Sequence, residues 1–327
     1  MSATFDLLSE RAFVLALALL IDRYVIDPAW LWSRVPHPVV GFGALISAVE
    51  RRALGRGSSR EWRGGILLVV LLVMTSGGIA WLVHAVDLFR FAEVVVVAVL
   101  LAQRSLVQHV RAVSEGLERS LADGRSAVSM IVGRDTSEMG EAEVAAAAIE
   151  SLAENESDGV VAPAFWYLIL GPFGIAVYKA VNTADSMVGH LTERHARFGW
   201  ASARLDDVLN YVPARLTAGM FMVLHRDFGI HAAVAGEARL HRSPNAGWPE
   251  AALARVAGLR LGGPRRYGND EVAASFINAD GRTPERADIE RCLGFVHSLF
   301  LLLVASCVVL AAAHVSELLH HLAAWIG

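Results

Sequence analysis

The sequence predicts an all-α, polytopic integral membrane protein with about four to six membrane-embedded helical segments, and three observations support this. Apolar residues make up 54% of the 327 residues, and the mean hydropathy is +0.44, which is higher than soluble proteins usually reach. Residues 64–86 and 292–313 are long enough to cross the hydrocarbon core, which takes roughly 20 apolar residues as a helix. Arginine-rich stretches separate the apolar runs, and the positive-inside rule places them on the cytoplasmic side.

The other apolar segments are shorter or interrupted. The run at 159–181 contains Gly171, Pro172 and Gly174 near its middle. Such residues at membrane depth are typical of broken helices or re-entrant segments, so a hairpin that dips in and returns is the expectation here. We predict a single membrane-embedded domain over 1–327, with spans near 12–31, 64–86, 88–104, 159–181, 205–224 and 292–313 and polar regions at 32–63, 104–158 and 225–291.

Charge and cysteine content exclude two broad classes of function. The net charge of −4 argues against a nucleic-acid surface, because phosphate binding needs a clustered basic excess. Cys292 and Cys307 both lie in one apolar run, which indicates small buried hydrophobes and neither a disulfide framework nor a zinc site.

Carboxylates recur at helical spacing in the alanine-rich segment 141–159. Glu143, Glu150, Glu154 and Asp158 fall on one face of the predicted helix. Carboxylate oxygens suit Mg²⁺, which takes one or two of them together with phosphate oxygens. The sequence therefore indicates a metal-binding acidic face, and a solvent-exposed acidic helix is the open alternative.

A second polar group follows the interrupted apolar run. Lys179, the only lysine in the chain, precedes Asn182, Thr183 and Asp185. Polar groups at the edge of a membrane segment are costly unless they are paired or face water, which makes them candidate functional residues. The alternative is a lysine that extends to the interface beside a helix cap.

Further candidates lie in three other segments. The stretch 203–216 carries Asp206, Asp207, Asn210 and Arg215, which could hold a metal ion or a cationic ligand, or could simply neutralise one another. His37 lies between two prolines in a rigid turn. The segment 243–268 combines Gly, Pro, Asn and Arg, including Asn245, in a pattern suited to anion binding.

Several long motifs resemble one known family. They are "PHPVVGFGALI", "GRDTSEMGEAEVAAAAIESLAENESDGVVAPAFW", "YKAVNTADSMVGH", "RFGWASARLDDVLNYVPARLTA" and "SPNAGWPEAALARVAGLRLGGPRRYG". In this order they resemble the adenosylcobinamide-phosphate synthases of cobalamin biosynthesis, the CobD/CbiB membrane proteins. Two departures are visible: alanines at 145–148 where the family pattern has an arginine, and Glu156, which adds a carboxylate to the predicted acidic face.

The resemblance implies an acid–amine ligase. Such an enzyme joins the amine of (R)-1-amino-2-propanol phosphate, or of aminopropanol, to a propionate carboxylate of adenosylcobyric acid, with ATP as co-substrate and Mg²⁺ or a similar divalent cation. The implied partners are the corrinoid and amine substrates, the lipid bilayer, and a second copy of the chain or other cobalamin-pathway enzymes. The implied location is the cytoplasmic (inner) membrane with a cytoplasmic active face. A membrane corrinoid transporter or carrier is the alternative.

Residue chemistry within the matched segments assigns the roles. The expected catalytic residues are Glu150, Glu154, Asp158, Lys179, Asp185 and His37. The expected substrate or phosphate contacts are Arg134, Asp135, Thr136, Asn155, Asn182, Thr183, Asn210, Arg215 and Asn245. The expected metal ligands are Glu150, Glu154, Asp158, Asp185, Asp206 and Asp207. Lys179 is expected to supply a positive charge near phosphate, with no covalent role.

Overall fold

The protein folds into two compact units, each built from segments that alternate along the chain. The structure, a computed structural model, describes the backbone of residues 2–25, 37–86, 90–189, 194–267, 270–272 and 274–326, and their side chains apart from those of 2–5, 265–267, 270–272 and 313–326. Unit 1 comprises Met1–Leu101, Ala162–Leu209 and Val304–Gly327, and unit 2 comprises Ala102–Val161 and Asn210–Leu303.

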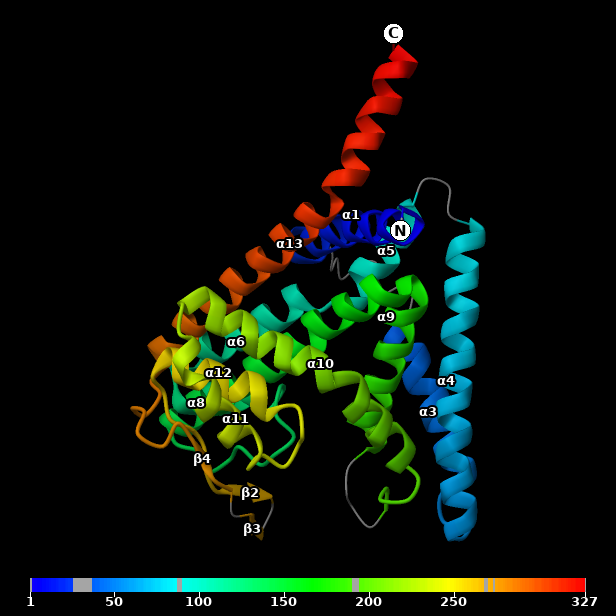
Figure 1. Cartoon of the computed structure of the whole chain (residues 1–327). Coiled ribbons are helices and arrows are strands. Elements are labelled where there is room, and N and C mark those ends of the chain that lie inside the picture. Colours follow the sequence, from blue (N-terminus) through cyan, green and yellow to red (C-terminus); the bar gives the residue numbers. More distant parts are fainter. Residues whose placement is uncertain are drawn as a thin grey trace. The chain divides into compact units, whose positions relative to one another are not determined.

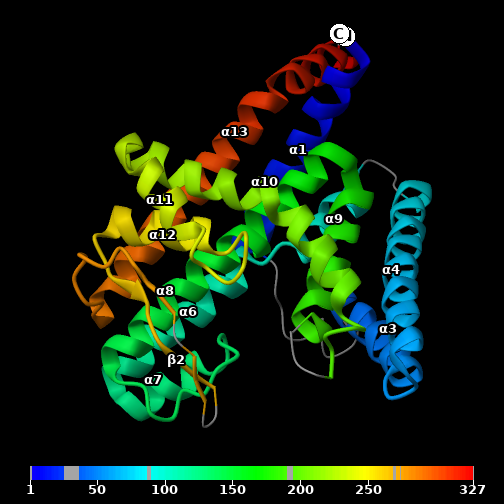
Figure 2. The same ribbon diagram turned by 60° about the horizontal axis from the view of Figure 1, so that its bottom comes forward.

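Unit 1 is built from long apolar helices. These are α1 (Ser2–Tyr24), α3 (Pro38–Ala53), α4 (Ser58–Val86), α5 (Phe91–Leu100) and α9 (Ala162–Val188), together with the first part of α10 (Trp200–His225) and the last part of α13 (Arg286–Ile326). Helix α4 packs against α3 and α9, as both views of the molecule show (Figures 1 and 2). A buried cluster that includes Phe42, Ile46, Leu68, Leu72 and Phe198 joins these elements.

Two adjacent glycines allow the closest approach to α4. A Cβ added at Gly65 would lie 2.1 Å from the carbonyl oxygen of Phe198, and one at Gly64 would lie 2.4 Å from the Cβ of Ala53. Neither distance is compatible with a larger side chain, so the glycines let α3 and the segment before α10 pack directly on the α4 backbone. The start of α4 is thereby fixed against its neighbours.

Helix α9 is broken where the sequence predicts a break. Gly171 has φ 63° and ψ −150° and is followed by Pro172, and the two halves of α9 run in different directions (Figure 1). A broken helix leaves backbone carbonyls without partners. Arg11 of α1 is the hydrogen-bond partner of two of these carbonyls, because its Nη1 donates to the carbonyl oxygens of Leu168 at 3.1 Å and Ile169 at 2.6 Å. The predicted re-entrant path of 159–181 through a bilayer stays a prediction.

The all-α, multi-pass fold class is confirmed. Four helical stretches of the described chain are long and apolar enough to cross a membrane, namely 58–86, 91–119, 141–188 and 286–312. The stretch 91–119 contains both α5 and α6 (Gln103–Arg119), with a break at residues 101–102. Helix α10 covers the predicted span 205–224 but is not among the four. Residues 26–31 of the first predicted span and residues 88–89 of the third lie outside the described part.

Unit 2 contains shorter helices and two small β-ladders. Helix α6 packs against α7 (Leu121–Val128) and α8 (Glu141–Glu156), and α12 (Gly247–Ala257) packs against α8 and α11 (His231–Ala238), which follows the 3₁₀ turn Phe228–Ile230. Strand β1 (Leu261–Gly262) pairs antiparallel with β4 (Phe276–Ile277), and β2 (Arg265–Tyr267) with β3 (Asp270–Val272). The remaining parts of α10 and α13 complete the unit.

A π-helical turn at Ser157–Val161 ends α8. The carbonyl oxygen of Gly159 accepts a hydrogen bond from the backbone N–H of Ala102 at 3.1 Å, where α6 begins. Beside it, Gln103 and Glu156 are both fully buried, and the Gln103 amide lies 3.1 Å from a Glu156 carboxylate oxygen. Glu156 therefore does not extend the acidic face as predicted, because it points into the protein and is bound there by an amide.

Candidate functional site

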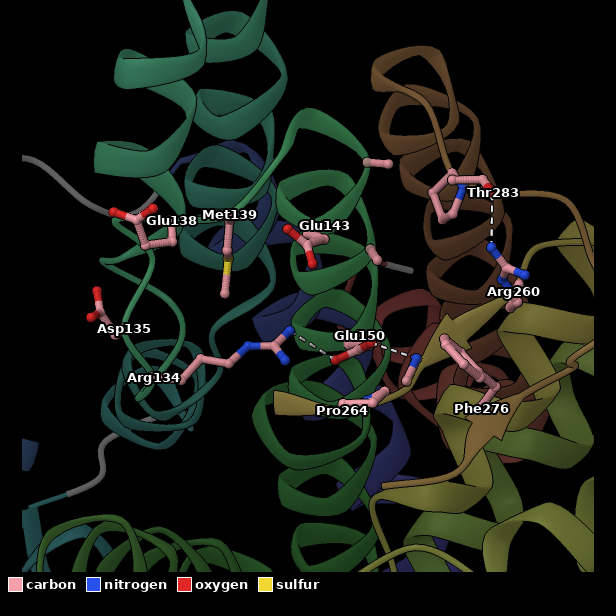
Figure 3. A pocket seen from close by; sticks show the side chains of 14 residues that line it. Arg134, Asp135, Glu138, Met139, Glu143, Glu150, Arg260, Pro264, Phe276 and Thr283 are labelled. Carbon is pink, nitrogen blue, oxygen red and sulfur yellow. Dashed lines mark hydrogen bonds and ion pairs between the residues drawn. The ribbon is translucent and has the colours of Figure 1, made fainter. Parts of the chain in front are cut away.

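A pocket of about 490 Å³ lies in unit 2 between α8, the loop that precedes it, and the segment around β1 and β4. This volume is within the range of small-molecule sites. Its charged lining residues are Arg134, Asp135, Glu138, Glu143, Glu150 and Arg260, and its remaining lining residues are Met139, Ala142, Ala146, Gly262, Pro264, Phe276, Thr283 and Pro284 (Figure 3).

Glu150 joins two walls of this pocket. One of its carboxylate oxygens lies 3.3 Å from Nη2 of Arg134, and the other accepts a hydrogen bond of 2.7 Å from the backbone N–H of Gly262. The Glu150 side chain is 8% exposed and that of Arg134 is 12% exposed. Burial on both sides means that the pair is weakly screened by water and salt. Glu150 thus fixes both the Arg134 guanidinium and strand β1.

Hydrogen bonds between side chains and backbone groups hold the loop that carries Arg134. Oδ1 of Asp135 accepts a hydrogen bond from the N–H of Ser137 at 2.9 Å, and Oγ1 of Thr136 donates to the carbonyl of Arg125 at 3.2 Å. Glu143 accepts a hydrogen bond from the N–H of Gly140 at 2.7 Å and so caps the start of α8. The predicted residues Asp135 and Thr136 therefore shape the loop, and Asp135 also lines the pocket.

Arg260 is the second cation of the pocket. Its guanidinium lies 5.1 Å from the centre of the Phe276 ring, and its Nη2 donates to Oγ1 of Thr283 at 3.1 Å. In Figure 3 these residues lie on the opposite side of the pocket from Arg134. Two guanidinium groups and several carboxylates thus face one space, which suits a ligand that carries both phosphate and ammonium groups.

The predicted acidic face is only partly in this pocket. Glu154 and Asn155 are exposed on α8, and Asn155 Nδ2 donates to the Ser151 carbonyl at 2.9 Å. Asp158 lies within the π-helical turn, where the changed number of residues per turn alters the direction of side chains. The i, i+4 spacing on which the prediction rests therefore does not continue unchanged to Asp158.

A metal cage built from protein side chains alone does not fit the described residues. Within them, no three side chains of Asp, Glu, His or Cys are close enough together to hold a metal ion. Glu150, the predicted ligand that lines the pocket, already contacts Arg134 and the Gly262 N–H. The predicted metal set of Glu150, Glu154, Asp158, Asp185, Asp206 and Asp207 accordingly does not form one preformed cluster within either unit.

A second polar cluster in unit 2 surrounds Arg215. Its guanidinium lies 3.6 Å from the centre of the Tyr211 ring and 4.7 Å from that of Trp248. Its Nη1 also donates to the Tyr211 carbonyl at 2.6 Å and lies 3.4 Å from Oδ1 of the buried Asn245. The structure thus brings together the predicted Arg215 and Asn245, and the buried Asn210 lies on the same helix.

The predicted polar group after the apolar run lies in unit 1. Lys179 and Asp185 are half-buried on the second half of α9, and Oγ1 of Thr183 donates to the Lys179 carbonyl at 2.6 Å. Asn182 Nδ2 lies 3.3 Å from Oδ1 of Asp206, which ties α9 to α10. These residues belong to a different unit from Asp158, so the predicted approach of Lys179 and Asp185 to the acidic face stays a prediction.

Two predicted residues of unit 1, Asp207 and His37, make local contacts. Asp207 pairs with Arg204 at 3.4 Å, one helical turn away. Nδ1 of His37 accepts a hydrogen bond from the N–H of Val39 at the start of α3, and its Nε2 lies 3.1 Å from the Val99 carbonyl. Nδ1 of His37 thus caps the start of α3. The predicted role of His37 in proton transfer stays a prediction.

Arg260, Phe276, Thr283 and Glu138 are pocket residues that the sequence reasoning missed. Arg260 lies in the Gly- and Pro-rich segment 243–268, which is predicted to bind anions. The composition of that segment could therefore have indicated Arg260 as a candidate. Phe276 and Thr283 lie in short, irregular segments without periodicity. Their position depends on the β1–β4 pairing, which the sequence did not indicate.

The chain is similar to curated proteins along most of its length. The family described as CobD/Cbib protein matches residues 15–296. A cobalamin biosynthesis protein CobD of Brucella anthropi is 47% identical over 296 residues, which cover 85% of this chain and 90% of that protein. A protein of the same name from a Sinorhizobium species is 50% identical over 82% of this chain and 88% of its own length.

More distant relatives carry the same name, while known structures do not match. A cobalamin biosynthesis protein CobD of Rhodobacter capsulatus is 44% identical over 86% of this chain and 91% of its own length. No solved structure matches the chain. From the family match and these relatives, the chain belongs to the CobD/CbiB family of cobalamin biosynthesis proteins.

Proposed function

We propose that the protein is an ATP-dependent ligase that joins an aminopropanol phosphate to a propionate carboxylate of adenosylcobyric acid. The observation that carries the proposal is that separate family motifs meet at one pocket. The motif at 133–166 supplies Arg134 and Glu150, and the motif at 243–268 supplies Arg260 and Gly262. Segments about 110 residues apart in the sequence thereby form a space lined by both cations and carboxylates.

The chemistry requires activation of a carboxylate. A carboxylate oxygen of the corrinoid attacks the γ-phosphorus of ATP, which forms an acyl phosphate and releases ADP. The neutral amine then attacks the acyl carbon, the C–O bond to phosphate breaks, and inorganic phosphate leaves as the amide forms. One proton is lost from the amine nitrogen. Negative charge accumulates on phosphoryl oxygens throughout, so fixed cations stabilise both steps.

The pocket residues are suited to these requirements. We propose that Arg134 and Arg260 bind phosphate oxygens, since guanidinium groups bind them in a bidentate manner. Glu138 and Glu143 face the same space and would attract the ammonium group and accept its proton. Lys179 and Arg215 are proposed as further phosphate contacts. The residues Glu154, Asp158, Asp185, Asn182, Thr183, Asn210 and Asn245 are proposed to contact substrate.

Magnesium is proposed as a component of the nucleotide substrate. Mg²⁺ binds commonly through phosphate oxygens with one or two carboxylates and several waters. This form of binding does not need the protein cage that the described residues lack.

The proposal is tested with the purified full chain in lipid nanodiscs. Adenosylcobyric acid, ATP, Mg²⁺ and aminopropanol phosphate are added, and corrinoids are identified by mass spectrometry. We expect a mass increase equal to the amine minus one water, together with ADP release, and neither without ATP. Arg260→Gln should reduce turnover at least 100-fold, whereas Arg242→Gln, at an exposed arginine of the same unit, should not.

The outcome also separates the ligase from a corrinoid transporter. Uptake of unchanged corrinoid into proteoliposomes, without any mass increase, would contradict the ligase proposal and support a transporter. If ligation occurs, inside-out and right-side-out vesicles locate the active face. We propose that this face is cytoplasmic and that the membrane is the inner membrane, because arginine-rich loops favour that side.

A further inference from the structure

The turn between α3 and α4 gathers five arginines in a small space. Arg51 and Arg52 lie in the last turn of α3, and Arg60 and Arg63 lie at the start of α4, with Arg56 between the helices. Gly55 and Gly57 have φ of 71° and 97°, a conformation that side-chain-bearing residues rarely adopt. The two glycines therefore make the turn tight. We refer to these five residues as the arginine turn.

The acidic residues of this segment are already neutralised by another part of unit 1. Glu50 pairs with Arg194 at 3.1 Å and with His195 at 2.9 Å. Glu61 lies 3.5 Å from Arg197 and accepts a hydrogen bond from the Gly55 N–H. Within the described residues, none of the five arginines forms an ion pair, and all five are exposed. The arginine turn therefore presents about five positive charges to the surroundings.

The arginine turn lies at one end of the most exposed membrane-crossing candidate. Only 22% of the apolar window of α4 is buried in the structure. Large apolar side chains begin directly after Arg63 and include the exposed Ile66, Leu67, Val70, Met74, Trp81 and Leu82. Trp62 contacts Trp200, with ring centres 4.9 Å apart, and such aromatic residues favour the membrane–water interface. With α4 across a bilayer, the arginines lie at the level of the headgroups.

We infer that the arginine turn is a binding site for the headgroups of anionic phospholipids, independent of the reaction proposed above. Two features favour a lipid over a soluble anion. The charges lie on or next to a helix that is long and apolar enough to cross a membrane, and Arg63 directly follows Trp62 of an aromatic pair suited to the interface. Guanidinium groups bind phosphodiester oxygens through two parallel hydrogen bonds. Each such cation near an anionic membrane surface strengthens binding about fivefold.

The test compares lipid preference in matched variants of the full chain. The protein is reconstituted with equal amounts of phosphatidylglycerol and phosphatidylcholine, and native mass spectrometry counts the lipids that it retains. Wild type should retain phosphatidylglycerol preferentially, and the preference should fall as salt increases. Changing Arg51, Arg56 and Arg60 together to Gln should lower the ratio of the two lipids roughly 100-fold. Changing the same three to Lys should preserve most of the preference.

The control removes the same charge elsewhere. Arg226, Arg239 and Arg242 are exposed arginines of unit 2, and their combined change to Gln should leave the lipid ratio within about threefold of wild type. An equal loss of preference in both triple variants would overturn the inference, because net charge would then explain it. A wild type that retains both lipids equally at low salt would overturn it without any variant.

Discussion

The buried pair of Arg134 and Glu150 offers the sharpest test of how the pocket is held together. We consider the change Glu150→Gln, which keeps the shape of the side chain and one carbonyl oxygen. That oxygen still accepts the hydrogen bond from the Gly262 N–H, which is 2.7 Å long in wild type. The negative charge opposite Arg134 is lost, so only water in the pocket then stabilises the Arg134 guanidinium.

The expected loss of stability follows from the burial of the two groups. Both side chains are nearly covered, at 8% and 12% exposure, which separates this pair from surface ion pairs that contribute only about 0.2–1 kcal/mol. A hydrogen bond to a charged group contributes about 1.5–3 kcal/mol. Because Arg134 keeps some contact with water, the full penalty for an isolated buried charge, about 3–5 kcal/mol, is not expected. We therefore predict a loss of about 1.5–3 kcal/mol.

A double-mutant cycle measures this value without other contributions from either residue. The free energy of unfolding is determined by urea titration in mild detergent for wild type, Glu150→Gln, Arg134→Gln and the double variant. We expect a coupling energy of at least about 1.5 kcal/mol, with little change between low and high salt. A coupling energy below about 0.5 kcal/mol, as at exposed sites, would refute the conclusion that Glu150 positions Arg134.

Two further predictions concern close contacts in unit 1. In a thermal unfolding assay, Gly65→Ala should destabilise the protein by more than about 2 kcal/mol, because its Cβ would lie 2.1 Å from the Phe198 carbonyl oxygen. The control Gly78→Ala should be neutral or slightly stabilising, because nothing lies within 4 Å of a Cβ at that position. Equal effects at both sites would contradict the packing. Arg11→Gln should destabilise the break in α9 by about 1–3 kcal/mol and speed proteolysis near Gly171; unchanged proteolysis would show that the Leu168 and Ile169 carbonyls do not depend on Arg11.

Much of the fold could be predicted because local composition determines it. The charge-free run at 64–86 has nowhere favourable to lie except in a bilayer or a large core, and it forms α4. Gly171 and Pro172 predict a break by themselves, since glycine permits φ of 63° and proline cannot donate a backbone hydrogen bond. The partner that stabilises the break could not be predicted, because Arg11 is 160 residues away in the sequence and nothing local indicates it.

Part of the candidate site could also be predicted from local features of the sequence. Helical spacing singled out Glu150 and the motif before it singled out Arg134, and both residues line the pocket. The expectation that Glu156 adds a carboxylate to the acidic face was wrong, because the structure buries this residue against Gln103. The π-helical turn that follows contains Gly159, whose carbonyl oxygen accepts a hydrogen bond from the Ala102 N–H, and a repeat based on an ideal α-helix does not predict such a turn.

The sequence by itself determined that this is a helical membrane protein of the CobD/CbiB family, because apolar length and long ordered motifs are properties of the chain alone. Only the tertiary structure decided which polar residues meet. It placed Arg260 and Phe276 opposite Arg134, made His37 cap a helix, and, among the residues that the structure describes, left the arginines of the α3–α4 turn without acidic partners. The physical reason is that side-chain pairing depends on long-range packing, in which the partner of each charge comes from a distant segment.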